Sequence, residues 1–287
     1  MRTICLRLLV TLALMGLAPW ARAALSCTAP QSTGFSTAYA AAGVVPNVSQ
    51  GTVNFNCTRS TAGDATSILL TANNGANATG AQNRARSGNN RILYEAYKDS
   101  ACSAVWTSTV PADYWSINLL NILGAQSVSV SYWGCITVAG QVVSAGTYTD
   151  TVTMQVLDTT PQRRSLSGKS TFPVSITSPA TFAITVAPGD VAFSYTTFGP
   201  VVNASTTFVT RGTLDLPYTM TLNADSGVAS GLNYSLNIDS QASPVSARGS
   251  GAAQTHTING SMPAGQAGTC STGSCSSSQV HTLTITY

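Results

Sequence analysis

Short stretches in which apolar and polar residues alternate recur along the whole chain, separated by turn-forming residues. Clear cases lie at 52–56, 127–131, 151–156 and 233–238. Because successive side chains of a strand point to opposite faces, alternation with a period of two predicts strands that bury one face. Many short strands between turns are typical of β-sandwiches. The pattern therefore predicts an all-β fold.

The order of these stretches repeats once along the chain. The corresponding segments are 70–75 and 222–227, Phe35-Ser36 with Tyr39 and Phe193-Ser194 with Phe198, 91–94 and 231–234, and 149–154 and 279–285. Each pair alone could arise by chance in a sequence rich in threonine, serine, alanine and valine. Pairs that keep the same order favour two tandem domains of the same fold.

The region 158–177 between the two copies predicts a linker, because it contains turn-forming residues and several basic ones. Within it, Phe172, Val174 and Ile176 alternate with other residues and have no counterpart ahead of the first copy. We expect residues 171–177 to return to the first domain as its closing strand. An edge position is expected, because the proline in this segment has no N–H group to donate.

The predicted domains are 24–157 and 178–287, and the second has no segment that could serve as its own closing strand. The chain ends in an alternating strand that carries Leu283, Ile285 and Tyr287 on one face. We expect the outer edge of this strand to lack a partner. An unpaired edge can accept a strand from another chain.

The first 23 residues predict a secretory signal peptide. Basic residues precede an apolar stretch at 8–17, and Ala21-Arg22-Ala23 provides small residues at the cleavage site. We therefore expect export. Without Arg2, Arg7 and Arg22 the 13 basic residues no longer outnumber the 10 acidic ones, so the mature chain is formally neutral. A neutral chain lacks the clustered basic surface that nucleic acid requires, and no nucleic-acid partner is expected.

An even number of cysteines remains after removal of the signal, which predicts disulfides in an exported protein. They are Cys27, Cys57, Cys102, Cys135, Cys270 and Cys275. Sequence alone permits many pairings, and local closure favours 27 with 57, 102 with 135, and 270 with 275. A metal site is disfavoured because no Cys-x-x-Cys occurs and because His256 and His281 are expected to face solvent from threonine-rich strands.

The sequence contains no motif typical of an enzyme. There is no Gly-x-Ser-x-Gly elbow, and the two histidines are isolated from any evident nucleophile. The acidic residues Asp113, Asp150 and Asp239 lack the paired arrangement that glycosidases use. We expect neither catalysis nor a cofactor.

Both halves resemble the spore coat protein U domain, the subunit fold of archaic (Csu-type) chaperone–usher pili. In the first half the resemblance lies in 51–57, 92–99 with Trp106, and 145–152, and in the second half in 198–200, 216–218, 231–234, 264–270 and 281–287. It implies immunoglobulin-like, pilin-type sandwiches that lack one strand. The partners that it implies are a periplasmic pilus chaperone, an outer-membrane usher and an adjacent pilin subunit that adds the missing strand.

Ordinary subunits of this family are single domains with a donor extension ahead of the first cysteine. This chain has two domains and only three residues between the predicted cleavage site and Cys27. We therefore expect a subunit that accepts a strand and donates none, which implies a tip adhesin at the cell surface, active in adhesion and biofilm formation. One alternative is a structural coat or fibre subunit that uses 172–176 as a free donor. Another is a secreted carbohydrate-binding module with Trp106, Trp115, Tyr132 and Trp133 in its site.

In tip adhesins of the family, apolar loops at the far end of the first domain attach to abiotic, hydrophobic surfaces. The resemblance implies such a role, toward an abiotic or host surface, for Val44, Val45, Leu119, Leu120, Ile122, Leu123, Val142 and Val143. Exposed apolar patches usually mark interaction sites. The alternative for Leu119 and Ile122 is that they belong to the core together with Trp115 and Ile117, because long apolar runs are more often buried.

Overall fold

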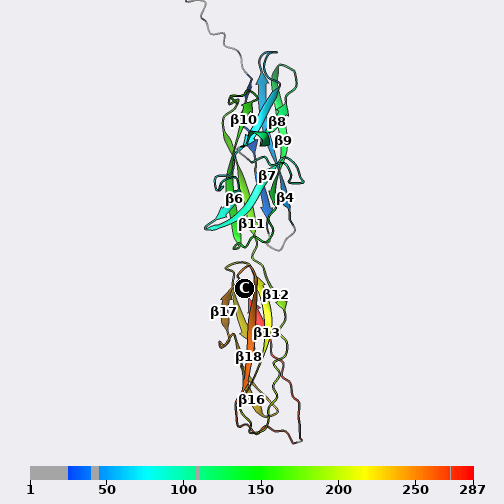
Figure 1. Cartoon of the computed structure of the whole chain (residues 1–287), viewed down its shortest axis with the longest axis vertical. Helices are drawn as coiled ribbons and strands as arrows, with labels where there is room; N and C mark the ends of the chain where they lie inside the picture. The colour runs from blue at the N-terminus through cyan, green and yellow to red at the C-terminus, as the bar shows by residue number, and fades with distance from the viewer. Residues whose placement is uncertain (1–24, 40–44, 108–109, 272) are drawn as a thin grey trace, which may run out of the picture.

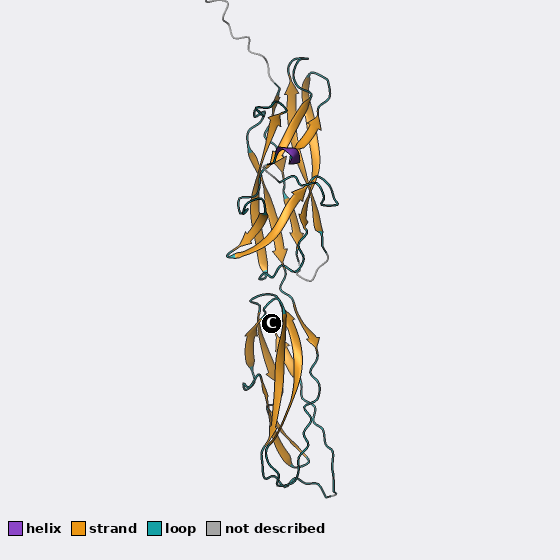
Figure 2. Cartoon of the chain, in the orientation of Figure 1, coloured by secondary structure: helices purple, strands orange, loops and turns teal. Residues whose placement is uncertain are grey.

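The computed structural model describes residues 25–39, 45–107, 110–271 and 273–287, so the predicted signal peptide lies outside the described residues. Two elongated domains lie end to end (Figure 1). Strands dominate both domains, and the one helical element in the described part of the chain is the 3-10 turn η1 (Pro111–Asp113) (Figure 2). The protein is therefore all-β, as the alternating pattern predicts. Among the described residues, no helix has the length and apolar character needed to cross a membrane.

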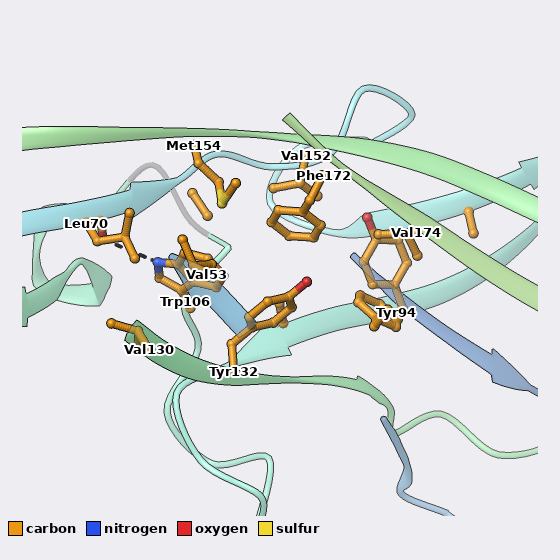
Figure 3. Packing of buried hydrophobic residues seen from close by; sticks show 14 of the residues in the cluster. Val53, Leu70, Tyr94, Trp106, Val130, Tyr132, Val152, Met154, Phe172 and Val174 are labelled. Atoms are coloured by element: carbon orange, nitrogen blue, oxygen red, sulfur yellow. Dashed lines mark hydrogen bonds between the residues drawn. The ribbon is translucent and has the colours of Figure 1, made fainter. Parts of the chain in front are cut away.

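Domain 1 is a single curled sheet of 11 strands. They are β1 (Ser26–Cys27), β2 (Gln31–Ser32), β3 (Phe35–Ala38), β4 (Asn47–Arg59), β5 (Ser67–Ala72), β6 (Asn83–Ser87), β7 (Asn90–Tyr97), β8 (Trp115–Asn118), β9 (Gly124–Ile136), β10 (Gly146–Asp158) and β11 (Ser170–Ser178). The path through the sheet is β1-β4-β9-β7-β6-β10-β11-β3, with β2 on β4 and with β5 between β10 and β8. The sheet curls so that β9 faces β10 and β11 across the core (Figure 3).

The core of domain 1 centres on aromatic side chains from distant segments. The fully buried ring of Trp106 stacks on Phe172 with the ring centroids 5.9 Å apart and lies 5.0 Å from Tyr132. Its indole N–H donates a hydrogen bond to Leu70 O at 3.2 Å (Figure 3). This bond satisfies the polar end of a side chain that would otherwise be costly to bury.

Strand β11 completes domain 1. It pairs antiparallel with β10 along its whole length and parallel with β3. Its inward-facing residues Phe172, Val174 and Ile176 are at most 1% exposed. Burying each such side chain contributes roughly 1.5–3 kcal/mol. The run that alternates in the sequence therefore folds back onto domain 1, which contradicts the alternative in which 172–176 is a free donor segment.

The linker predicted at 158–177 is wrong in its second half, because β11 occupies that part. The loop between β10 and β11 covers only 159–169, and the connection between the domains is 179–181. The edge position predicted for Pro173 is found at the proline itself, although β11 as a whole lies between two strands. Pairing with β3 starts one residue later, at Val174, so β11 has a paired strand on one side only at the proline.

Domain 2 consists of two sheets. Its strands are β12 (Phe182–Val186), β13 (Val202–Gly212), β14 (Pro217–Leu222), β15 (Ser226–Ala229), β16 (Leu232–Ile238), β17 (Val245–Arg248), β18 (Ala253–Met262) and β19 (Leu283–Thr286). One sheet has the order β12-β13-β18-β16-β15 and the other β17-β14-β19. Phe208, Met220 and Ile258 lie in the buried core between them, whereas many apolar residues around it are only half-buried.

The structure contains the three disulfides that local closure favours. Cys27–Cys57 joins β1 to β4, Cys102–Cys135 fixes a loop to β9, and Cys270–Cys275 closes a short loop ahead of β19. The first two bonds each connect residues 30 or more positions apart, and the third spans 5. Since longer loops lose more entropy in the unfolded chain when they are closed, the first two stabilise more.

Replacing Cys27 and Cys57 by Ser should lower the free energy of unfolding of domain 1 by about 2–5 kcal/mol, because the unfolded chain regains the freedom of a long loop. Urea denaturation of the full chain followed by tryptophan fluorescence measures this, because Trp106, Trp115 and Trp133 all lie in domain 1. The Cys270→Ser/Cys275→Ser variant is the matched control and should leave this transition unchanged. An equal loss in both variants would contradict the assignment of the first bond to the stability of domain 1.

Candidate functional site

The last strand of domain 2 has an open edge. β19 pairs antiparallel with β14, and no strand in the described part of the chain pairs with its other side. Leu283 and Ile285 face the core and are half-buried, and Tyr287 is 65% exposed. The ring of Tyr287 stacks on Phe182 at 5.2 Å, which places this end of β19 beside the start of domain 2 and next to domain 1 (Figure 1).

A pair of reciprocal hydrogen bonds identifies β19 as the counterpart of the last part of β10. In domain 1, Asn73 N–H donates to Thr153 O at 3.0 Å and its Oδ1 accepts from Thr153 N–H at 2.7 Å. In domain 2, Asn223 and Thr282 make the same two bonds, each at 3.0 Å. The repeat recognised between 149–154 and 279–285 therefore corresponds to equivalent strands.

A second repeated arrangement, here called the tyrosine–glutamine cluster, marks the same end of both domains. In domain 1, Tyr39 Oη accepts from Gln141 N–H at 2.7 Å, and the Gln141 side chain bonds both backbone groups of Leu93. In domain 2, Tyr195 accepts from Gln266 N–H at 2.9 Å, and the Gln266 side chain bonds both backbone groups of Asn233. The proposed correspondence of Tyr39 with Phe198 is therefore wrong, because Tyr195 takes the place of Tyr39 in this cluster.

With the two domains matched in this way, domain 2 lacks a counterpart of β11. In domain 1, β11 lies between β10 and β3. In domain 2, β19 corresponds to the end of β10 that starts at Met154, and residues 276–282 take the place of the part of β10 that pairs with β11. Neither 276–282 nor the segment with Val191, Phe193 and Tyr195 pairs with a described strand. These three side chains are only half-buried against the core. The open edge therefore fits an added strand whose apolar residues alternate in the manner of β11.

An apolar loop lies at the end of domain 1 remote from domain 2. This apolar tip loop, residues 119–123, connects β8 to the start of β9. Leu120, Ile122 and Leu123 are 68%, 53% and 59% exposed, whereas Leu119 is buried at 8%. Leu119 thus anchors the loop in the core and does not belong to the exposed surface, because its side chain packs with the domain 1 cluster.

A buried arginine holds the apolar tip loop from below. Arg59 is 1% exposed, and its guanidinium donates to two neighbouring loops. Its acceptors are Leu120 O (3.5 Å), Asn121 Oδ1 (2.9 Å), Ile122 O (3.3 Å), Ala62 O (3.4 Å) and Asp64 O (2.9 Å). The Gln126 side chain also bonds both backbone groups of Leu120. Because the carbonyl groups are bound inside, the apolar side chains are presented outside.

Comparison with protein families gives one match. The family model described as Spore Coat Protein U domain matches residues 12–155, about half of the chain. The chain belongs to this family. The match covers domain 1 up to β10, and neither β11 nor domain 2 lies within it.

Several solved structures are similar to this spore coat protein U family member, and no curated protein matches it. One is the chaperone–tip adhesion subunit complex CsuC-CsuE from the archaic chaperone-usher Csu pili of Acinetobacter baumannii, with 14% identity, coverage of 91% of this chain and 100% of that chain, and a TM-score of 0.40. Another is the CupB6 tip adhesin of Pseudomonas aeruginosa, with 10% identity, coverage of 91% and 94%, and a TM-score of 0.40. A third is the CssB subunit of enterotoxigenic Escherichia coli complemented with a donor strand from CssA, with 17% identity, coverage of 52% and 96%, and a TM-score of 0.30.

The loop with Val142 and Val143 lies at the end of domain 1 that meets domain 2 and not at the distal end. β9 runs from the apolar tip loop toward domain 2, so the loop that follows it, with Val142 and Val143, lies at the domain junction. Val143 is 6% exposed, and a Cβ atom on Gly251 of domain 2 would come within 2.4 Å of Val142 Cγ1. Val45 precedes β4 at this same end, and Val44 lies outside the described residues. The assignment of Val142 and Val143 to a distal surface is therefore wrong.

Both histidines take part in the interior of domain 2, contrary to the expectation that they face solvent. His256 is 6% exposed, with Nδ1 2.6 Å from Asp239 Oδ2 and Nε2 2.9 Å from the Tyr218 hydroxyl. His281 is half-buried, with Nε2 2.7 Å from the Tyr234 hydroxyl. The described residues contain no cluster of three or more His, Cys, Asp or Glu residues suited to a metal ion.

The aromatic residues expected of a carbohydrate-binding module do not form an exposed site. Trp106 and Tyr132 are fully buried, and Trp115 and Trp133 are half-buried. A cavity of about 420 Å³ over the outer face of β4 and β9 is lined mainly by polar residues such as Asn54, and no tryptophan or tyrosine is among its lining residues. The stacking platform for a sugar ring is therefore missing there.

Burial shifts the acid–base properties of several core groups in domain 1. Burial raises the pKa of Glu95, although hydrogen bonds from Asn83 and Thr107 oppose the shift. Burial also raises the pKa of Tyr132 to about 12, and it raises that of Tyr94, whose hydroxyl donates to Asp150 Oδ2 at 2.8 Å. These groups are packed inside the sandwich, so their shifts follow from core packing.

Replacing Arg59 by Lys should lower the free energy of unfolding of domain 1 by about 1–3 kcal/mol, because an ammonium group cannot reach acceptors on both loops and leaves buried carbonyl groups unpaired. Arg86→Lys is the matched control, since Arg86 is exposed, and should change stability by less than about 0.5 kcal/mol. Urea denaturation with tryptophan fluorescence compares the two variants. Equal stability of both variants would contradict the role of Arg59 in fixing the loops.

Proposed function

We propose that this protein is a subunit of a chaperone–usher pilus that accepts a donor strand at the open edge of domain 2 and attaches to apolar surfaces through the apolar tip loop of domain 1. The position that fits this combination is the tip of the fibre. Strand addition of this kind gains affinity from main-chain hydrogen bonds and specificity from alternating side chains.

The observation that carries the proposal is the contrast between the two domains at one strand position. β11 closes domain 1 from within the chain, whereas the counterpart position in domain 2 has no described strand. Half-buried apolar residues flank this position on both sides, Leu283 and Ile285 on one strand and Phe193 on the other segment. Because an unpaired edge next to an incompletely covered core favours pairing with another chain, domain 2 is the acceptor.

The open edge of domain 2 determines the order in which its partners would bind. The same open edge would be available to a periplasmic chaperone first and to an adjacent pilin subunit later, with the usher as the place of exchange. Domain 1 needs no partner to close its core, because Phe172, Val174 and Ile176 already fill it. It is therefore free to act as the surface-binding domain.

The apolar tip loop supplies the attachment surface. Its three exposed apolar side chains lie on a loop whose backbone is fixed by Arg59 and Gln126. A fixed loop loses little conformational entropy when it binds, so its affinity for an apolar surface is higher than that of a flexible one.

A self-complemented chain tests the acceptor role. Residues 170–178, with the proline changed to Thr, would follow Tyr287 through a spacer and an Asn-Gly turn, in the register that β11 has on β10. We expect amide hydrogen exchange of residues 276–283 to slow by at least about tenfold, because in this register the new strand pairs with them.

The matched control is the same extension with serine in place of the residues copied from Phe172, Val174 and Ile176, which keeps the backbone and removes the apolar side chains. Mass spectrometry after exchange compares both proteins with the unextended chain. If exchange of residues 276–283 is equally fast in all three proteins, domain 2 is not a strand acceptor.

Changing Leu120, Ile122 and Leu123 to Asp should reduce attachment of piliated cells to polystyrene by at least about tenfold, because charged side chains resist transfer to an apolar surface. Pilus assembly should be unchanged, since the three side chains already face solvent. Quantitative adhesion and immunodetection of sheared pili measure the two properties separately.

The matched control changes three comparably exposed residues of domain 2, Ile184, Val186 and Val228, which are 46%, 52% and 51% exposed, to Asp. Adhesion of this control should match that of the unaltered protein wherever its pili assemble. Full adhesion of the tip-loop variant would remove the apolar tip loop as the attachment surface.

A further inference from the structure

The end of domain 2 that carries the tyrosine–glutamine cluster corresponds to the end of domain 1 that contacts domain 2. In domain 1, Gln141 of the cluster precedes Val142, Val143 and Ser144, which meet domain 2. Ser144 Oγ lies 3.1 Å from Asp215 Oδ2 across the junction. A neighbouring sandwich domain therefore covers this end of domain 1.

In domain 2 the same end carries an exposed aromatic residue. Phe198 is 72% exposed, and Val201 beside it is 52% exposed. The Phe198 N–H donates to Gln266 O at 2.9 Å, so the cluster itself holds the residue in place. We call Phe198 and Val201 the distal apolar pair, because β16, which starts next to the cluster, lies at the end of domain 2 remote from domain 1 (Figure 1).

The backbone of Phe198 is held in an unfavourable conformation. Its φ angle is +55°, in the left-handed region that residues with a bulky side chain rarely occupy. Such strain persists only where the surrounding structure imposes it, and it is concentrated at functional positions. Here the strain accompanies an aromatic ring that faces solvent, which gives no benefit to the folding of the isolated chain.

The direction of the added strand determines where the subunit that donates it lies, which is at the end of domain 2 with the tyrosine–glutamine cluster. β11 runs antiparallel to β10 and leaves domain 1 at the end with the cluster, where the connection 179–181 leads into the next domain. A strand added antiparallel beside β19, as β11 lies beside β10, would leave domain 2 at the end with the tyrosine–glutamine cluster of domain 2. The folded body attached to that strand would then lie against the distal apolar pair.

From these observations we infer that Phe198 and Val201 form a docking surface for the folded body of the subunit that donates its strand to domain 2. The inference rests on the proposed function and adds a second contact to it, outside the added strand. The occupant is a sandwich domain, because a domain of that kind covers the corresponding end of domain 1 in this chain. The contact would set the angle between successive subunits, as the domain junction does within the chain.

Site-specific photo-crosslinking in the full chain, expressed in piliated cells, tests the inference. The probe is p-benzoylphenylalanine placed at Phe198, with Tyr287, directly after β19, as a second site and the exposed Val186 as the control. We expect the probes at 198 and 287 to give adducts with the same pilin subunit in sheared pili, and the probe at 186 to give none. An adduct at 287 without one at 198 would overturn the docking surface and leave the proposed function standing. No subunit adduct at 287 would overturn both.

A substitution separates docking from folding. Phe198→Gly removes the aromatic ring and also relieves the left-handed backbone, so the thermal midpoint of the purified chain should stay equal or rise. The fraction of the subunit retained on sheared pili after mild urea treatment should fall severalfold. Val186→Ser is the control for loss of an exposed apolar side chain and should change neither quantity. Unchanged retention of the Phe198→Gly variant would contradict the inference.

Discussion

The architecture depends on the hydrogen bonds that β11 makes to the two strands beside it, β10 and β3. Where β11 lies between β10 and β3, both of its edges are paired and three apolar side chains complete the core. At the counterpart position in domain 2, residues 276–282 pair with no described strand, and the apolar residues on either side stay half-buried. Buried backbone groups need hydrogen-bond partners, and a core needs cover. One domain is therefore closed by its own chain, and in the other this position is open among the described residues, which is the basis of the proposed strand addition.

The same principle of satisfied backbone groups explains how an apolar loop stays exposed. Apolar side chains at a free loop would lower their free energy by collapsing onto the domain. Here Arg59 and Gln126 donate hydrogen bonds to backbone oxygens of the apolar tip loop from the inside. These bonds also satisfy the buried guanidinium group, which would be costly to bury without acceptors. The inward polar contacts and the outward apolar side chains are consequences of one arrangement.

The tyrosine–glutamine cluster gives both domains the same polarity. In each domain it ties the loop that precedes the last core strand to the sheet, and in domain 1 it marks the end at which β11 leaves the domain. In domain 1 that end meets domain 2. In domain 2 it carries Phe198, whose strained backbone and exposed ring have a physical reason only if something covers them. Successive domains would then meet through one type of end-to-end contact.

Local alternation was enough for the sequence to determine the all-β class, the return of 171–177 to domain 1 and the terminal strand with Leu283 and Ile285, because a period of two is a property of neighbouring residues. The family membership also followed from local motifs. The end at which each loop emerges depends on strand direction and order, so only the tertiary structure separated the distal Leu120, Ile122 and Leu123 from Val142 and Val143 at the junction. Equally, the burial of His256 depends on Asp239 and Tyr218 from other elements, and Tyr195 replaced Phe198 as the counterpart of Tyr39 only through hydrogen bonds to distant residues. Composition and spacing contain no information on such contacts, because they form between segments that the fold alone brings together.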